Sequence, residues 1–231
     1  MQKHKRPNRR RAIGFLVGIT LSVVALTILL VPQNSWMISA GTMNSGHEKL
    51  VCEKCHRAAQ GTIRQQLQAN VQYLLANRDK SVYIKRLPVS NDDCLVCHRR
   101  PKDNHPVFRF FEPRFKEARQ KIQPQYCNSC HKEHSGKRVT MDPTSCVVCH
   151  EKLTLKKDSV DVSHKTIIKH KRWDTCMGCH DFHGNHKMKL KTKILQMLPQ
   201  KRIVAYFDGK SSPYSTEKRF KAKETRLNEI K

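Results

Sequence analysis

The pattern Cys-x-x-Cys-His occurs five times in this 231-residue sequence and contains all ten of its cysteines. No cysteine is left for a disulfide, a thiol nucleophile or a separate metal site. Two thiols at this spacing reach the two vinyl groups of one haem, and the following histidine becomes the proximal ligand of the iron. The sequence therefore predicts five covalently attached c-type haems. The cysteines are Cys52, Cys55, Cys94, Cys97, Cys127, Cys130, Cys146, Cys149, Cys176 and Cys179, and the proximal histidines are His56, His98, His131, His150 and His180.

Two other kinds of cysteine chemistry fit this pattern less well. A structural zinc site usually combines two Cys-x-x-Cys pairs around one ion, and nothing in it requires a histidine after every pair. A thioredoxin-like redox motif would occur once, within a βαβ pattern. Haem attachment is the interpretation that uses every residue of the pattern.

The composition limits the fold. Apolar residues make up 38% of the chain, and much of this fraction lies in one N-terminal run. The rest has too few large apolar residues for an ordinary core of its size, and five porphyrins would supply the missing apolar mass. We therefore expect a mostly α-helical fold with much irregular structure: an N-terminal transmembrane helix, then a multihaem cytochrome c domain built around five packed haems.

The formal net charge of +26 is extreme. The propionates of five haems would neutralise part of it, and the remaining positive surface favours acidic redox partners or anionic lipid head groups. Nucleic-acid binding is the other usual interpretation of such a charge. It is disfavoured here, because haem is attached outside the cytoplasm.

The N-terminus predicts a membrane anchor. Residues 1–11 are a basic flank, and residues 12–31 form an uncharged run long enough to span a bilayer. This run exceeds the core of roughly 7–15 residues in a cleavable signal peptide, and Ile38-Ser39-Ala40 is a poor cleavage site. An uncleaved signal anchor is therefore favoured over a cleaved one. The positive-inside rule then predicts a single-pass protein of the bacterial inner membrane, with its haem domain in the periplasm.

The rest of the chain divides by composition. Residues 32–46 are expected to be a juxtamembrane linker, with Trp36 either an interfacial anchor or part of a disordered connector. Residues 47–186 hold all five motifs and form the expected pentahaem domain. Residues 187–231 are expected to be a basic C-terminal tail, either a solvated helix or flexible segment or a docking surface for a partner or membrane.

The intervals between motifs follow no fixed period, so a regular repeat array is excluded. The shortest step, 19 residues from Cys127 to Cys146, predicts that the third and fourth haems are neighbours. The first interval contains an amphipathic helix, expected to pack on haem edges or alternatively to bind a partner. Its apolar positions are Ile63, Leu67, Val71, Leu74 and Leu75.

Seven further histidines follow the apolar run, and five irons each need a sixth ligand. Several of these histidines lie within a few residues of a motif, such as His134 and His183, three residues after a proximal histidine. The predicted distal set is His47, His105, His134, His170 and His183, with His164 and His186 as alternates. Methionine ligation is a less favoured option that would raise a haem potential. Its candidates are Met43, Met141, Met177 and Met188.

The five motifs and these histidine offsets resemble multihaem cytochromes c of the class III type over residues 47–186. The resemblance implies bis-histidine, six-coordinate haems of low potential. Class III proteins are usually soluble, tetrahaem and shorter, so the anchor and the fifth haem depart from the pattern. Two membrane-anchored families resemble the layout as well. They are the quinol dehydrogenases, whose first motif lies nearer the membrane, and the pentahaem subunit of alternative complex III.

There are more spare histidines than irons, so every iron can have a sixth ligand and none must keep an open coordination position. Pentahaem nitrite reductases mark their catalytic haem with Cys-x-x-Cys-Lys, and this sequence contains no such motif. We therefore expect an electron-transfer protein of a respiratory chain and not an enzyme. Quinol or a quinol-oxidising complex is a candidate partner, and the sequence itself does not specify the donor or the acceptor. The alternatives are a haem enzyme that reduces a small nitrogen or sulfur oxyanion at one five-coordinate haem, and a mainly structural subunit.

Overall fold

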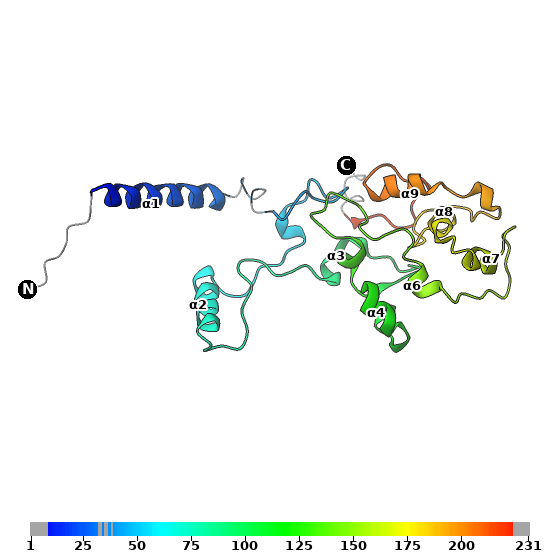
Figure 1. Cartoon of the computed structure of the whole chain (residues 1–231), viewed down its shortest axis with the longest axis horizontal. Helices are drawn as coiled ribbons and strands as arrows, with labels where there is room; N and C mark the ends of the chain where they lie inside the picture. Colours follow the sequence, from blue (N-terminus) through cyan, green and yellow to red (C-terminus); the bar gives the residue numbers. More distant parts are fainter. Residues whose placement is uncertain (1–8, 32–33, 35–36, 38, 224–231) are drawn as a thin grey trace, which may run out of the picture. The chain divides into compact units, whose positions relative to one another are not determined.

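A computed structural model describes residues 9–31, 34, 37 and 39–223. The chain divides into two units, Met1–Thr42 and Met43–Lys231, which are coloured along the sequence in Figure 1. Within the described residues helices are the only regular elements, joined by much irregular structure. This confirms the expected helical character of the chain and its N-terminal apolar helix.

The first unit contains helix α1 (Arg9–Leu30). It begins three residues before the predicted span and ends one residue before its predicted end. The helix is long and apolar enough to cross a membrane, as an anchor or as a signal sequence, and none of its apolar stretch is buried in the protein. Residues 1–8 of the basic flank and Trp36 lie outside the described residues.

The second unit is built from short helices joined by turns. Its α-helices are α2 (Ile63–Leu74), α3 (Asn91–His98), α4 (Lys116–Ile122), α5 (Cys127–Cys130), α6 (Val147–His150), α7 (His164–Lys169), α8 (Cys176–Cys179) and α9 (Gln200–Phe207). Its 3₁₀ turns are η2 (Cys52–Lys54), η3 (Val107–Phe111), η4 (Pro113–Phe115), η5 (Trp173–Thr175) and η6 (Ile194–Gln196). Two isolated antiparallel bridges, Ala58 to Arg86 and His186 to Lys218, are the only β contacts among the described residues.

The apolar core of the second unit is small and lies between α8 and α9. Ile203 of α9 is fully buried and packs with Phe207 and with Met177 of α8. The backbone of α8 lies close to the segment just before α9 at Gly178, where an added Cβ would lie 2.7 Å from the carbonyl oxygen of Leu198. Residues 187–223, expected as a tail outside the haem domain, therefore belong to the second unit and supply part of its core.

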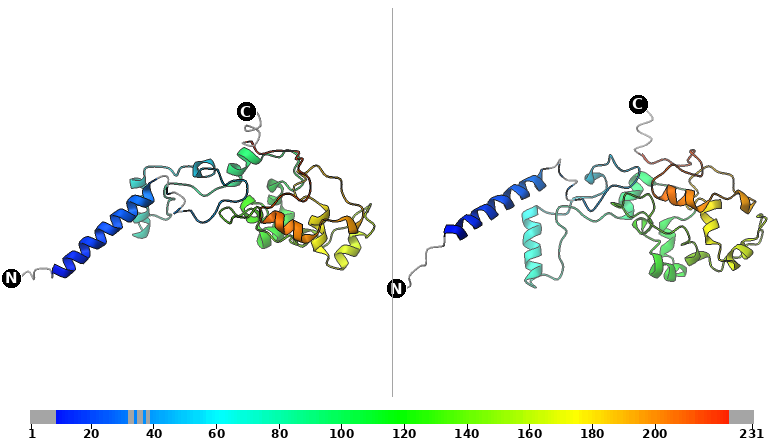
Figure 2. Two further views of the ribbon diagram at one scale, coloured as in Figure 1. Left: turned by 90° about the horizontal axis from the view of Figure 1, so that it is seen from above. Right: turned by 45° about the horizontal axis from the view of Figure 1, so that its top comes forward.

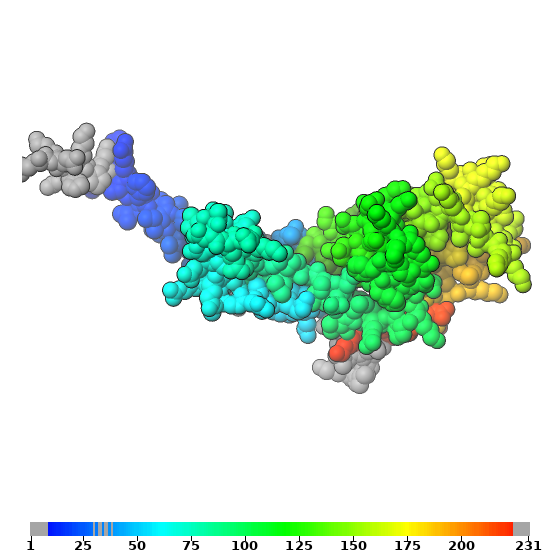
Figure 3. Space-filling model, turned by 90° about the horizontal axis from the view of Figure 1, so that it is seen from below, coloured from blue at the N-terminus to red at the C-terminus, as the bar shows by residue number. Residues whose placement is uncertain are grey.

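Helix α2 lies apart from the other helices of the second unit (Figures 1 and 2). A capping box between Thr62 and Gln65 begins it. The amide of Gln66 is buried and donates to the carbonyl of Gly61, while Asn70 bonds the backbone of Val82. These polar contacts hold one side of α2 against its own loop and leave its apolar stripe exposed. In Figure 3 the cyan residues around α2 form a lobe beside the green residues around α4.

Candidate functional site

Each Cys-x-x-Cys-His motif folds into about one turn of helix. In four of the motifs the backbone N–H of the histidine donates to the carbonyl of the first cysteine, and in the second motif α3 supplies the turn. Such a turn places residues three apart on one side of the helix, so both thiols of a motif face the same way. The four hydrogen bonds run from His56 to Cys52 (2.9 Å), His131 to Cys127 (2.9 Å), His150 to Cys146 (2.9 Å) and His180 to Cys176 (2.8 Å).

None of the ten cysteines forms a disulfide. Two contacts between thiols group the motifs. Cys94 donates a hydrogen bond to Cys127, which raises the pKa of Cys94 and lowers the pKa of Cys127. Cys176 donates to Cys146 with the same effect on their pKa values. The second motif therefore adjoins the third, and the fourth adjoins the fifth.

Five pairs of histidine rings form the candidate site. Every motif histidine faces one histidine from outside the motifs, and no histidine belongs to two pairs. The ring-centre distances are 6.4 Å for His56 and His134, 5.8 Å for His98 and His47, 6.0 Å for His131 and His183, 6.2 Å for His150 and His105, and 6.2 Å for His180 and His164. No pair joins a motif histidine to the nearest spare histidine in sequence.

These distances fit iron held between two imidazoles. An imidazole nitrogen binds a first-row transition metal at about 2 Å and lies about 1 Å from its ring centre, so rings on opposite sides of one iron have centres about 6 Å apart. The observed separations are 5.8–6.4 Å. Within the described part of the chain, no group of three or more His, Cys, Asp or Glu side chains is placed to hold a metal ion. The pairs are therefore the candidate ligand positions.

The structure brings four of the five predicted distal histidines into pairs: His47, His105, His134 and His183. The fifth, His170, is exposed and joins no ring pair among the described residues; the alternate His164 takes the place beside His180. Both belong to the α7 segment, and six residues turn a helix by about 600°, or 240° net. The two histidines therefore face different sides, and only one of them faces His180.

The other alternate, His186, lies in a different setting. Its side chain is buried beside Tyr206 and Tyr214, and its Nδ1 lies 2.9 Å from Oδ2 of Asp181. Its Nε2 is buried with no hydrogen-bond partner among the described residues. His186 therefore belongs to an aromatic cluster and is not part of any of the five histidine pairs.

The Nδ1 atoms of several paired histidines are held by groups of the chain. Backbone carbonyls accept from His56, His105 and His131, at 3.0, 2.6 and 2.7 Å. Carboxylates hold three more: Glu133 bonds His47 at 2.8 Å, Asp158 bonds His164 at 3.0 Å, and Asp103 bonds His183 at 3.0 Å. With Nδ1 engaged, Nε2 is the nitrogen left for a metal, as is usual for ligating histidines.

These carboxylates were missed by reasoning from the sequence, although Glu133 lies between His131 and His134 and Asp103 two residues before His105. Burial is the largest single influence on Glu133 and raises its pKa, but the hydrogen bond and charge of His47 and smaller contributions together outweigh burial, so the pKa is lowered. The pKa of Asp103 is lowered in the same way: burial raises it, but the hydrogen bond and charge of His183, the hydrogen bond from the backbone of His105 and the charge of Arg100 together outweigh burial. Both carboxylates are therefore ionised at neutral pH.

Four of the motif histidines, His98, His131, His150 and His180, are held in the neutral form that metal binding requires. Burial, together with the neighbouring His47, lowers the pKa of His98 to about 4. Burial is also the main cause that lowers the pKa of His131, His150 and His180. Their lone pairs are therefore available near pH 7.

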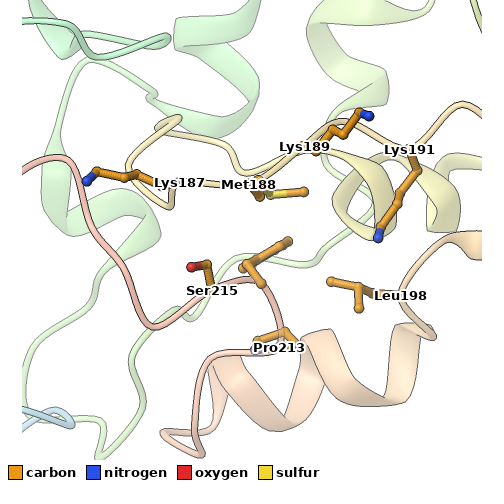
Figure 4. Close-up of a pocket in the computed structure, with 8 residues that line it drawn as sticks. Lys187, Met188, Lys189, Lys191, Leu198, Pro213 and Ser215 are labelled. Carbon is orange, nitrogen blue, oxygen red and sulfur yellow. The ribbon is translucent and has the colours of Figure 1, made fainter.

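The remaining candidates lie elsewhere. Met177 is part of the apolar core, and Sδ of Met141 lies 3.6 Å from Sγ of Cys130. Met188 lines a cavity of about 340 Å³ on the C-terminal segment, with Lys187, Lys189 and Lys191 around it. The three lysines spread around this cavity (Figure 4) and make it electropositive. It contains none of the paired histidines.

The sequence matches no protein-family model, and comparison with curated proteins and with solved structures finds no match.

Proposed function

We propose that the chain is a membrane-anchored pentahaem cytochrome c that carries electrons in a respiratory chain. The observation that supports this most strongly is the set of five histidine pairs. Each pair combines the histidine of one Cys-x-x-Cys-His motif with a different histidine from outside the motifs, at a separation that suits one iron.

In this proposal the ten motif cysteines hold the porphyrins through thioethers, and the paired histidines ligate the irons. A bound haem supplies one-electron redox chemistry. The chain's part would be to hold each iron between two paired histidines, to orient six of these imidazoles through their Nδ1 partners and to bury the ligands. A site closed on both sides favours electron transfer over substrate binding, and no observation specifically favours a reductase.

The membrane and partner assignments belong to the same proposal. Helix α1 is long and apolar enough to cross a membrane. In this proposal it would tether the second unit to the periplasmic face of the inner membrane. The net charge of +26 favours acidic redox proteins as partners. A membrane donor, either quinol or a quinol-oxidising complex, would be within reach of a tethered domain.

Intact mass and a reductive titration of the purified full-length protein test this proposal. We expect a mass increase of five haems with every cysteine consumed, and uptake of about five electrons per chain at potentials that reversible redox mediators reach. Ten free thiols, or bound zinc in place of haem, would contradict the proposal. Turnover of nitrite or hydroxylamine at one high-spin haem would support the enzyme alternative.

A further inference from the structure

One buried carboxylate contacts two of the five histidine pairs. Oδ2 of Asp103 lies 3.0 Å from Nδ1 of His183, and Oδ1 accepts the backbone N–H of His105 at 2.8 Å. Its side chain is only 9% exposed. His183 is paired with His131, and His105 with His150. Asp103 therefore links His183 and His105, the two non-motif histidines that face the histidines of the third and fourth motifs.

The two loops that carry these histidines are joined by further contacts. Nδ1 of His105 donates to the carbonyl of Phe182 at 2.6 Å, and the two rings stack with centres 4.2 Å apart. The backbone N–H of Asn104 donates to the carbonyl of His183 at 3.2 Å. A displacement of either histidine therefore disturbs the other.

The other two carboxylates bonded to paired histidines act on one pair each. Glu133 contacts His47. Asp158 contacts the side chain and backbone N–H of His164 and accepts the backbone N–H of Val160, which belongs to no histidine pair. Their side chains are 31% and 22% exposed. A carboxylate that accepts from Nδ1–H makes the imidazole a stronger electron donor, which favours the ferric state. Burial strengthens this effect, because the local dielectric is low.

We propose that Asp103 is a positioning residue shared by the third and fourth sites, which orients His183 and His105 together and lowers the reduction potential of the iron that His183 ligates. This inference rests on the proposed function. Arg100 opposes the effect on potential, because its Nε lies 3.1 Å from Oδ2 of Asp103 and draws charge away from His183.

Potentiometry of the haem-loaded full-length protein tests the proposal, with EPR to follow each iron. In Asp103→Asn the amide keeps its shape and still accepts from His105, but the charge is lost. We expect the reduction potential of one haem to shift upward. A separate variant, His183→Met, marks this haem, because methionine ligation raises its potential. Asp103→Glu should return that potential toward the wild-type value. Asp158→Asn is the matched control and should move only the haem of the His164 pair.

Arg100→Gln supplies the opposite change and carries the test if Asp103→Asn does not assemble. Removing the guanidinium leaves the carboxylate uncompensated, so the same potential should shift downward. The inference is overturned if Asp103→Asn leaves every potential unchanged, or if Arg100→Gln moves the marked potential upward. Failure of the proposed function would appear separately, as a wild-type chain without covalent haem.

Discussion

His164 and His170 lie six residues apart, and the structure places only His164 beside a motif histidine, at 6.2 Å from His180. Closeness to the fifth motif favoured His170 in the sequence. In the structure the helical turn between the two histidines directs their rings to different sides, so that His164 faces His180 and His170 does not. Asp158 adds to this preference by holding both Nδ1 and the backbone N–H of His164.

This difference gives a direct prediction for the loaded protein. His164→Ala should leave one iron five-coordinate, so that about one high-spin haem per chain appears in the visible and EPR spectra. His170→Ala is the control and should keep every haem low-spin. A high-spin signal in His170→Ala, with an unchanged spectrum in His164→Ala, would show that the assignment is reversed.

Gly184 is a second position where one residue decides the local geometry. Its φ is +65°, and an added Cβ would clash with the side-chain amide of Asn104. We expect Gly184→Ala to lower the free energy of unfolding by roughly 2–4 kcal/mol, combining the left-handed backbone strain with overpacking. Thermal unfolding measures this change.

Gly46 provides the matched control for that measurement. Its φ is +94°, but an added Cβ would meet nothing within 4 Å. Gly46→Ala should therefore cost only the backbone strain, about 1–2 kcal/mol. Equal losses in the two variants would mean that the contact with Asn104 is not tight.

Among the elements, the motif turns were the most predictable and the pairing between them the least. Cys-x-x-Cys-His specifies one local helical turn and its ligand. The partner of each motif histidine depends on how distant segments fold back. His47 precedes the first motif by five residues, yet it faces His98 of the second; His134 follows the third motif and faces His56 of the first. The sequence offsets identify which histidines are candidate ligands, but not which motif histidine each of them faces.

The burial of helix α9 was unforeseen for a related reason, although a solvated helix was among the expectations for this segment. Its segment has a high density of Lys and Arg, which favoured a solvated tail. The few apolar residues within it nevertheless align on one side, and Ile203 is completely buried against α8. Charge on the outer side of a short helix does not prevent burial of its inner side.

The packing of α9 predicts a large effect of a single truncation. Ile203→Ala should reduce the free energy of unfolding by about 2–5 kcal/mol, through lost burial and the cavity left behind. Val204→Ala, at a position that is 41% exposed, is the control and should change it by less than about 1 kcal/mol. Chemical denaturation of the two loaded variants compares them. Equal, small losses would indicate that α9 does not pack as described.

In the molecule as a whole, the histidine pairs join segments that are far apart in sequence. His56 and His134 are 78 residues apart, and His131 and His183 are 52 apart. The apolar core of buried residues is small. Metal ligation that closes long loops contributes directly to folding. The cofactors of the proposed function would therefore supply much of the stability that the core does not.

The ionised carboxylates give the pH dependence of that stability a definite sign. The pKa values of Asp93, Asp103, Glu133, Asp158 and Asp181 are all lowered in the folded protein. Hydrogen bonds from Ser90 lower the first. For Asp158 the hydrogen bonds from His164 are the main cause. For Asp103, Glu133 and Asp181 burial raises the pKa, but the hydrogen bonds and charges of the neighbouring histidines and smaller contributions together outweigh it. A lowered folded pKa contributes stability above the unfolded value, which is lost as pH falls through the folded value.

The unfolding temperature of the loaded protein should therefore fall as the pH is lowered from about 5 to about 3. Thermal scans followed in the visible band measure it. Glu133→Gln is the informative variant, since it should remove part of this dependence while lowering the stability at pH 7. A melting temperature that stays constant or rises toward pH 3 would contradict the charge state assigned to these carboxylates.

The central claim is that each of the five histidine pairs holds one iron on both sides. Low-temperature EPR of the fully oxidised full-length protein, quantified against its total haem, tests it most directly. The account predicts five low-spin ferric haems per chain and no high-spin signal. A high-spin signal of one or more haems per wild-type chain, or fewer than five haems in total, would contradict it.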